Sequence, residues 1–485
     1  MKQNKSGHNK HSVSQNKNQK KTNIKTKDDE KLEDKFSIFR LDKLFHFSHV
    51  PVKWELIDYL LLSFITIISF TTHLLTIGEP SQVVFDEVYF GNFTNNYHRG
   101  EYYFDIHPPL GKLLLYAGSL ISRYQPYEVY SKIGAPLNKT EVTKLRIWPA
   151  SAGAIRAPVL YIFLKLLDVS PVWCFTASFM ISLDNALLVE SRMILIDAFL
   201  SMFALVTLAL TAFMTRHPKH VYLMAVLSGL AAGATVSIKF TGAGVALTLV
   251  IAYFMSYPFS DAFILSFISG ISGLFLFFIQ FPIHFALLPH PGTGCPFHPS
   301  SFCRGLERGE KFPTIPLTSY LLKTMLKSNL AINVQHSYAS KWWQWPFMLG
   351  RGTYLWVDKD RQLWCVGSPA VWYSGLLGLI VWIFRTILKA DTRKTLFMIL
   401  GYLISYLPFM NIKRVMWNYH YFIPLLYSIS MGAIAANSIK SNAYIVPALL
   451  CAAAAACYVI YFPLTYGTPL PYDKYLKIMF KCWRY

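Results

Sequence analysis

Two stretches are most informative about fold and function: FDEVYFG at residues 85–91 and DIHPPLGK at residues 105–112. Both follow the first long apolar segment. The first stretch carries two adjacent carboxylates, Asp86 and Glu87. An ionised side chain that faces hydrocarbon costs several kcal/mol even on the most lenient insertion scales. The two carboxylates therefore belong in water or in a polar cavity at a membrane surface.

The second stretch forces a bend in the backbone. Pro108 and Pro109 remove two amide donors and push His107 into an extended conformation before the apolar run at 110–121 begins. That run is short for a membrane span. We predict that it forms a helix at the membrane interface.

The composition is that of a polytopic membrane protein. Hydrophobic residues make up 53% of the 485 residues and charged residues only 15%, too few to cover a soluble chain of this length. Of the net charge of +20, +7 lies in residues 1–53, which hold 13 Lys and Arg against 6 Asp and Glu. We predict that 1–53 is a basic, disordered cytoplasmic tail, and we expect no nucleic-acid partner.

Apolar runs of the length that a hydrocarbon core requires recur along the chain, and we predict eleven membrane spans. The first begins at Leu56, too far along for the core of a cleavable signal peptide, so we expect it to act as its own insertion signal. The predicted spans cover residues 56–77, 147–167, 171–189, 193–214, 221–238, 241–257, 262–288, 367–387, 394–410, 418–436 and 443–462.

Lys and Arg in short loops predict the orientation, because they favour the cytoplasmic side. The residues placed there are Arg216, Lys219, Arg385, Lys389, Arg393, Lys394 and Lys440. With the N-terminus in the cytoplasm, an odd number of spans puts the C-terminus on the opposite, luminal face. Two large loops, 78–146 and 289–366, are predicted on that face as well.

The same topology gathers charges at the luminal ends of the spans, where the positive-inside rule disfavours Lys and Arg. These charges are Asp86, Glu87, Arg146, Glu190, Arg192, Lys239, Lys413 and Arg414. A polar site at the luminal membrane surface that binds an anion explains their presence.

A carboxylate pair beside cations fits a general base next to an anion clamp. If the substrate is a lipid-linked phosphosugar, Arg or Lys holds the leaving phosphate and Asp86 takes the proton of an acceptor hydroxyl. Glu87 points elsewhere, because neighbouring residues share no face of a helix or strand. We therefore expect Glu87 to orient the site and not to share the role of base.

Each of these residues also has a structural interpretation, which the sequence leaves open. The two carboxylates can simply solvate a loop. Glu190, Arg192 and Asp197 can form an ion pair that caps two helices. Lys239 can snorkel from a helix end, and His107 can have a purely structural role in the turn.

The seven cysteines show no Cys-x-x-Cys pair or other zinc-ligand spacing, so we expect no metal site. Cys295 and Cys303 share the second large loop. If that loop is luminal, the two cysteines can form a disulfide, and the sequence does not decide whether they do.

The first loop, with VFDEV at 84–88, Phe90-Gly91, Tyr97 and DIHPPLGK at 105–112, resembles the first luminal loop of the protein O-mannosyltransferases. The resemblance continues in order along the chain and leaves out only the N-terminal tail. Its further segments are RIWPASAGA at 146–154, residues 184–197, HSYAS at 336–340, GSPAVW at 367–372, RVMWNYHY at 414–421 and FPLTYG at 462–467.

The resemblance implies a membrane enzyme of the endoplasmic reticulum with the GT-C fold, all helical across the membrane. It implies transfer of mannose from dolichyl phosphate mannose to Ser or Thr of secretory proteins, with inversion, by a dimer of identical or related chains. No cofactor is expected, and dependence on a divalent metal is left open.

The resemblance also assigns roles. The family's base aspartate falls on Asp86, its acidic partner on Glu87, and its important loop aspartate and arginine on Asp105 and Arg146. Charge and topology add Lys239 and Arg414 as further candidates for the donor phosphate. His107 and His420 complete the predicted substrate-binding set.

The chain departs from the family in its second loop, 289–366. Eukaryotic members usually carry a β-trefoil MIR domain there, and this loop is too short to hold one. We therefore predict a single GT-C catalytic domain over residues 54–485, with acceptor selection in doubt.

Three other functions are compatible with a polytopic membrane chain: a transporter, another GT-C enzyme and a catalytically silent partner subunit. A transporter predicts charges near the bilayer midplane and an internal repeat, and the sequence shows neither. Another lipid-phosphosugar-dependent GT-C enzyme and a catalytically silent partner subunit remain as alternatives.

Overall fold

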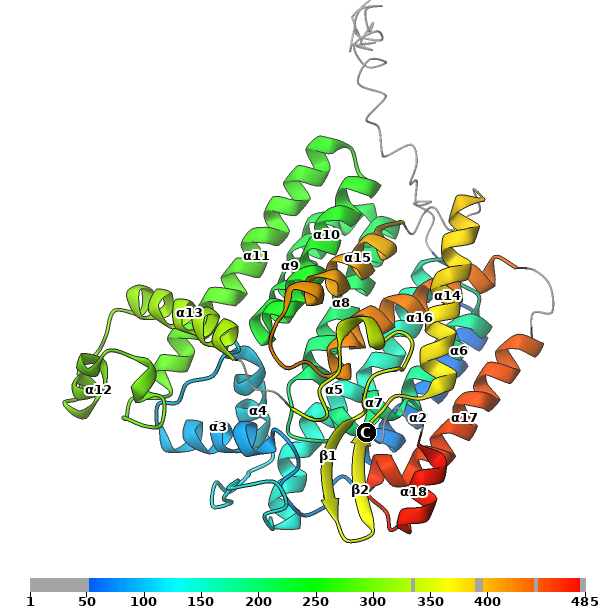
Figure 1. Cartoon of the computed structure of the whole chain (residues 1–485). Coiled ribbons are helices and arrows are strands. Elements are labelled where there is room, and N and C mark those ends of the chain that lie inside the picture. The colour runs from blue at the N-terminus through cyan, green and yellow to red at the C-terminus, as the bar shows by residue number, and fades with distance from the viewer. Residues whose placement is uncertain (1–51, 333–335, 389–395, 440–443, 480–485) are drawn as a thin grey trace, which may run out of the picture. The chain divides into compact units, whose positions relative to one another are not determined.

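The computed structural model describes residues 52–332, 336–388, 396–439 and 444–479. The chain divides into two units, Met1–Arg40 and Leu41–Tyr485, and the description that follows concerns the second (Figure 1). Nearly all of the predicted tail, 1–53, lies outside the described residues. The predicted cytoplasmic residues Lys389, Arg393, Lys394 and Lys440 lie outside them as well.

Among the described residues, seven helices are long and apolar enough to cross a membrane. They are α2 (Leu56–Leu74), α5 (Lys139–Leu166), α8 (Asp197–Arg216), α9 (Val221–Ile238), α11 (Phe259–Ala286), α14 (Pro369–Ile387) and α17 (Ile445–Tyr466). The pair α6 (Pro171–Ser182) and α7 (Asn185–Ser191) passes the same test jointly and is bent by 57°. By length and composition, the described residues thus hold seven helices that can span a membrane, or eight if the bent pair counts as one span.

The predicted number of eleven spans is not confirmed, although each predicted segment falls on a helix. The remaining three are the shorter helices α10 (Ala243–Ser256), α15 (Leu396–Tyr406) and α16 (Phe422–Asn437). Each adjoins a 3-10 turn at one end: Phe240–Gly242, Leu407–Asn411 and Asn418–Tyr421, respectively. These turns shorten the regular helix, and the sequence windows of apolar residues run through them.

The bend between α6 and α7 has an identifiable cause. Asp184 caps α7 by accepting a hydrogen bond from the Leu187 amide at 3.0 Å. Its second oxygen accepts from the Ser368 amide at 2.8 Å and from Trp372 Nε1 at 3.1 Å. One buried carboxylate therefore starts a new helix and ties it to the beginning of α14.

The first large loop contains α3 (Glu87–Arg99) and α4 (Leu110–Ile121). The helix predicted at 110–121 is present with the same bounds. Helix α3 ends at Gly100, whose φ of 68° favours glycine. The loop returns to the bundle through α5, where the Asn138 side chain caps the helix.

The second large loop contains α12 (Ser300–Glu307), α13 (Thr314–Ala331) and the antiparallel hairpin of β1 (Thr353–Asp358) and β2 (Arg361–Cys365). A disulfide joins Cys295 and Cys303. The hairpin lies in the loop and leaves the predicted helical membrane part unchanged. Its first strand, TYLWVD, is rich in the aromatic and β-branched residues that favour strands.

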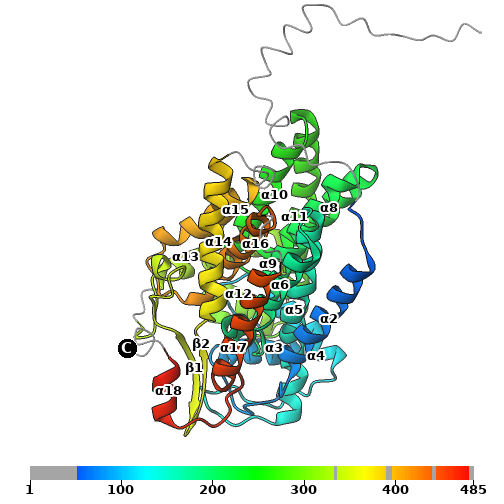
Figure 2. The ribbon, with the colours of Figure 1, turned by 90° about the vertical axis from the view of Figure 1, so that its right-hand side faces the viewer.

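Both loops gather at one end of the bundle. Figures 1 and 2 show α3, α4, the β1–β2 hairpin and the short helix α18 (Tyr472–Ile478) at that end. This arrangement agrees with the prediction that both loops share one face of the membrane.

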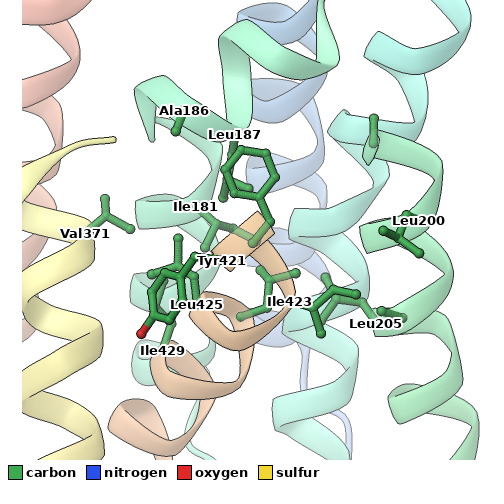
Figure 3. Packing of buried hydrophobic residues seen from close by; sticks show 14 of the residues in the cluster. Ile181, Ala186, Leu187, Leu200, Leu205, Val371, Tyr421, Ile423, Leu425 and Ile429 are labelled. Atoms are coloured by element: carbon green, nitrogen blue, oxygen red, sulfur yellow. The ribbon is translucent and has the colours of Figure 1, made fainter. Parts of the chain in front are cut away.

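Helix α16 occupies the centre of the core. Figure 3 shows its Leu425 and Ile429, with Tyr421 just before it, packed towards Ile181 of α6 and Val371 of α14. A helix that is apolar on all sides is expected to be buried in a bundle, and 13 of the 16 residues of α16 are buried. The segment that precedes α16 is thereby held rigidly.

Helices α9 and α11 approach each other through small residues. A Cβ added at Gly229 of α9 would lie 2.3 Å from the Ser269 carbonyl oxygen of α11. A Cβ added at Gly270 of α11, in contrast, would have no heavy atom within 4 Å.

We expect Gly229→Ala to lower the apparent melting temperature of the purified protein, because overpacking against backbone costs about 1–3 kcal/mol. Gly270→Ala is the matched control and should leave melting unchanged or raise it, since alanine favours helix by about 1 kcal/mol. Thermal melts of both variants in one detergent measure the difference. Equal melting of the two variants would contradict the tight approach of α9 and α11.

Candidate active site

Glu87 and Arg146 form a fully buried ion pair at the start of α3. Arg146 Nε donates to Glu87 Oε1 at 2.7 Å, and Arg146 Nη2 donates to Glu87 Oε2 at 2.7 Å. The other hydrogen bonds of the pair, at 2.8 to 2.9 Å, run to backbone groups of Pro80, Gln82, Val84 and Ile194. Glu87 is therefore committed to holding α3 against α5 and the turn before α8.

Asp86 differs from Glu87 in having no hydrogen-bond donor on its carboxylate within the described residues. It is partly accessible and stands at the N-cap of α3. The pKa of Asp86 is raised to about 6. Removal from bulk water is the largest cause; Lys239 lowers the pKa, and the Asp197 and Asp105 carboxylates raise it. An unpaired carboxylate with a pKa near neutrality has the properties of a general base.

Phe85, just before Asp86, has a φ of 46°. A non-glycine residue in this left-handed region costs of order 1–3 kcal/mol and persists only where its surroundings hold it. The Phe85 ring packs edge-on against Trp417 at 5.6 Å and against Tyr419 at 6.3 Å. The segment before α16 therefore fixes the backbone that presents Asp86.

Asp105 lies in an ion pair with Lys112, whose Nζ is 2.5 Å from Asp105 Oδ2. Lys112 Nζ also donates to the carbonyls of His107 at 2.6 Å and Pro108 at 2.8 Å. The lysine is buried in α4, so it reaches back to close the turn that the paired prolines begin. Asp105 is thus placed near Asp86 by a residue outside the predicted site.

The four predicted substrate-binding residues line one cavity of about 440 Å³. They are His107, Lys239, Arg414 and His420. Burial, together with Lys239 and other cations, lowers the pKa of His107 well below its usual value and that of His420 to about 3. Both imidazoles are therefore neutral, and the charge of the cavity wall is carried by Lys and Arg.

Lys239 is held by Asp197. The ammonium lies 2.8 and 2.6 Å from the two Asp197 oxygens, and it stands over the Tyr419 ring at 5.4 Å. This pair spans from the end of α9 to the start of α8, so Lys239 is anchored in the site and does not snorkel.

The structural interpretation of Glu190, Arg192 and Asp197 as one ion pair is wrong. Asp197 pairs with Lys239, while Arg192 donates to the His73 carbonyl at 2.9 Å and lies over the Tyr466 ring at 4.4 Å. Glu190 is buried and its carboxylate oxygens have no hydrogen-bond partner among the described residues.

Sequence reasoning did not assign Asp197, Lys112, Phe85 or Tyr419 to the site. Lys112 could have been found from the sequence, because it is the one charged residue in the apolar run directly after the His-Pro-Pro turn. Asp197 and Tyr419 act through partners more than 40 residues away, at Lys239 and near Asp86, which no local pattern shows.

No group of three or more His, Cys, Asp or Glu side chains in the described part of the chain is arranged to hold a metal ion. The cations that face the cavity are Lys239, Lys413 and Arg414. They are the groups present that can neutralise a phosphate there.

The fold and site define a multispanning membrane protein with a cationic cavity beside an unpaired carboxylate. A family model described as dolichyl-phosphate-mannose-protein mannosyltransferase matches residues 63–288. A model of the C-terminal four-transmembrane region of protein O-mannosyltransferase matches residues 319–483. The chain belongs to the protein O-mannosyltransferase family, as its motifs predicted.

Two curated relatives bear the name dolichyl-phosphate-mannose–protein mannosyltransferase 4. The Schizosaccharomyces pombe protein is 36% identical over 136 residues, 28% of this chain and 18% of its own length. The Candida albicans protein is 30% identical over 282 residues, 52% of this chain and 36% of its own length. The chain therefore spans well under half the length of the curated relatives it matches.

A solved structure has the same fold. The Saccharomyces cerevisiae protein O-mannosyltransferase Pmt1–Pmt2 complex bound to the sugar donor aligns with a TM-score of 0.77, over 89% of this chain and 94% of that one. The identity is 17%, so this likeness concerns the fold alone. The predicted fold class, a helical multispanning membrane protein of the GT-C type, is confirmed.

We expect Glu87→Gln and Arg146→Met each to destabilise the protein by about 3–5 kcal/mol, because each leaves a buried charge without its partner. The double variant should be destabilised by less than the sum of the destabilisations of the two single variants. Apparent melting temperatures of the four proteins measure this coupling.

The pair Glu141 and Lys144, 2.7 Å apart on the same helix but partly exposed, is the matched control. Its double-variant cycle should show coupling of about 0–1 kcal/mol. Equal coupling in the two cycles would contradict a special role for the buried pair.

Proposed function

We propose that this chain transfers mannose from dolichyl phosphate mannose to Ser or Thr hydroxyls of secretory-pathway proteins, with inversion at the sugar. The observation that carries the proposal is the placement of Asp86. Its carboxylate lacks a hydrogen-bond partner among the described residues and lies within electrostatic reach of Lys239, which lines the cavity. Membership of the family supplies the class of donor and acceptor.

The cavity of about 440 Å³ suits a lipid-linked phosphosugar. One part of its wall carries Lys239, Lys413 and Arg414, which match a phosphate. Another part carries Leu326 and Leu330 of α13, both exposed, which match the hydrocarbon of the lipid. A ligand that carries both a phosphate and a hydrocarbon chain would use the cationic and the apolar part of the wall together.

In the proposed reaction, Asp86 accepts the proton of the acceptor hydroxyl as its oxygen bonds to the anomeric carbon. The bond from that carbon to the phosphate oxygen breaks, and its electron pair leaves with the phosphate. Lys239 and Arg414 take up the charge that develops on the phosphate. Displacement from the opposite face inverts the sugar.

The other predicted residues position these groups. Glu87 and Arg146 fix the start of α3 and thereby the position of Asp86, its N-cap residue. Asp105, which is close enough to Asp86 to raise the pKa of that residue, is fixed by Lys112. His107 and His420 are neutral and offer hydrogen bonds to the sugar or phosphate without adding charge.

We place this activity in the endoplasmic reticulum membrane, with the N-terminus cytoplasmic and the site and C-terminus luminal. A dimer with itself or a related chain is part of the proposal, since the structural neighbour is a complex of two family members. We assign no cofactor. Residues 54–485 act as one catalytic domain, without a MIR domain in the loop 289–366.

The alternatives are a GT-C enzyme with a different donor or acceptor and a catalytically silent partner subunit. A silent subunit has no need of an unpaired carboxylate beside a cationic cavity, and maintaining one costs stability. This favours an active enzyme.

We expect Asp86→Asn to lower mannosyl transfer by about 10²–10⁴, the contribution of a general base. Transfer from dolichyl phosphate mannose to a Thr-containing peptide, in membranes with matched expression, measures the effect. Asp261→Asn, an exposed carboxylate at the start of α11, is the control and should keep full activity. Equal transfer by wild type and Asp86→Asn would remove Asp86 as base.

The pH profile gives a second test. A base works in its ionised form, so kcat/KM should be constant above the Asp86 pKa of about 6 and fall tenfold per pH unit below it. Asp86→Glu should retain a falling limb, and the residual activity of Asp86→Asn should lack it. A wild-type profile that stays level from pH 5 to 8 would contradict the assignment.

A further inference from the structure

A second cavity, of about 540 Å³, adjoins the one assigned to the donor. The two share the strip Ile412–Arg414 as a common wall. The far wall of the second cavity comes from the segment that leads to the β1–β2 hairpin, with His336, Lys341, Trp342 and Trp343. None of the residues that line it is acidic.

The wall combines fixed aromatic rings with free cations. Trp342 packs on the Tyr406 ring at 5.4 Å, and its carbonyl accepts a hydrogen bond from the Tyr406 hydroxyl at 2.9 Å. Trp343 is 45% exposed. Lys341 and Lys413 are exposed, and neither forms an ion pair within the described residues. Exposed tryptophan is typical of a binding surface, and the unpaired lysines give this one a positive charge.

A chain of aromatic contacts leads from this cavity to the proposed base. The His336 ring meets Trp417 at 4.7 Å, and Trp417 meets Phe85 at 5.6 Å. Phe85 directly precedes Asp86. Two ring contacts therefore connect the wall of the second cavity to the residue before the base, and the strip Ile412–Arg414 connects the same cavity to the donor cavity.

We propose that the second cavity binds the acceptor polypeptide and that Lys341, which lines this cavity alone, selects segments with Asp or Glu beside the acceptor Ser or Thr. This inference rests on the proposed function. An inverting displacement needs the acceptor oxygen and the leaving phosphate on opposite sides of the anomeric carbon, so the acceptor needs a place of its own next to the base. Trp343 offers the backbone of an extended chain a flat apolar surface, and Lys341 attracts the chain's carboxylates.

The test uses the full chain, dolichyl phosphate mannose and three peptides that differ only in the residues beside one Thr: Gly, Asp or Lys. We expect the wild-type KM to be about three- to tenfold lower for the Asp peptide than for the Lys peptide, the size of one or two partly exposed ion pairs. The difference should shrink as ionic strength rises.

Lys341→Gln should remove most of this preference and Lys341→Glu should reverse it, with the KM for the donor unchanged. Trp343→Ala should raise the acceptor KM for all three peptides. Lys323→Glu, on an exposed lysine of α13 that lines neither cavity, is the matched control and should behave as wild type.

The outcomes separate this inference from the function on which it rests. Equal KM values for the three peptides, with transfer intact, overturn the acceptor site and leave the enzyme assignment standing. A change in donor KM in the Lys341 variants overturns it in favour of a lipid headgroup in the second cavity. Absence of transfer to every peptide overturns both proposals.

Discussion

The buried pair of Glu87 and Arg146 is the constraint on which the site depends. Two charges removed from water are stable together only if their remaining donors and acceptors are satisfied, and here four backbone groups complete the network. Because consecutive residues of a helix point about 100° apart, fixing Glu87 between α3 and α5 turns Asp86 in another direction. The site thus uses one carboxylate of the pair as an anchor and leaves the other free.

A second pair completes this division of labour. Lys239 is the cation of the site that acts on Asp86, and Asp197 holds it at 2.6 Å. Had Lys239 bound Asp86 instead, the ion pair would have kept that carboxylate ionised at low pKa, and a strongly stabilised carboxylate is a poor base. Asp197 therefore keeps Lys239 in the cavity wall without consuming Asp86.

The sequence predicted what local patterns and charge determine. Each expected span falls on a helix. Lys239 and Arg414, predicted from charge and topology, line one cavity with the predicted His107 and His420. The predicted number of spans is not confirmed, because 3-10 turns shorten the regular helices α10, α15 and α16. Sequence reasoning did not predict the hairpin or the partner of Lys239, since strand pairing and ion pairs between distant segments depend on tertiary contacts.

The segment before α16 links these elements. Tyr421 anchors it in the core that Figure 3 shows, and α16 itself is buried on nearly all sides. The same segment presents Trp417 and Tyr419 to Phe85, and Arg414 to both cavities. A left-handed Phe85 persists only where its neighbours over-determine its conformation, and these rings supply that support. Donor wall, proposed acceptor wall and base are therefore positioned by one short stretch of chain, whose rigidity comes from the apolar helix that follows it.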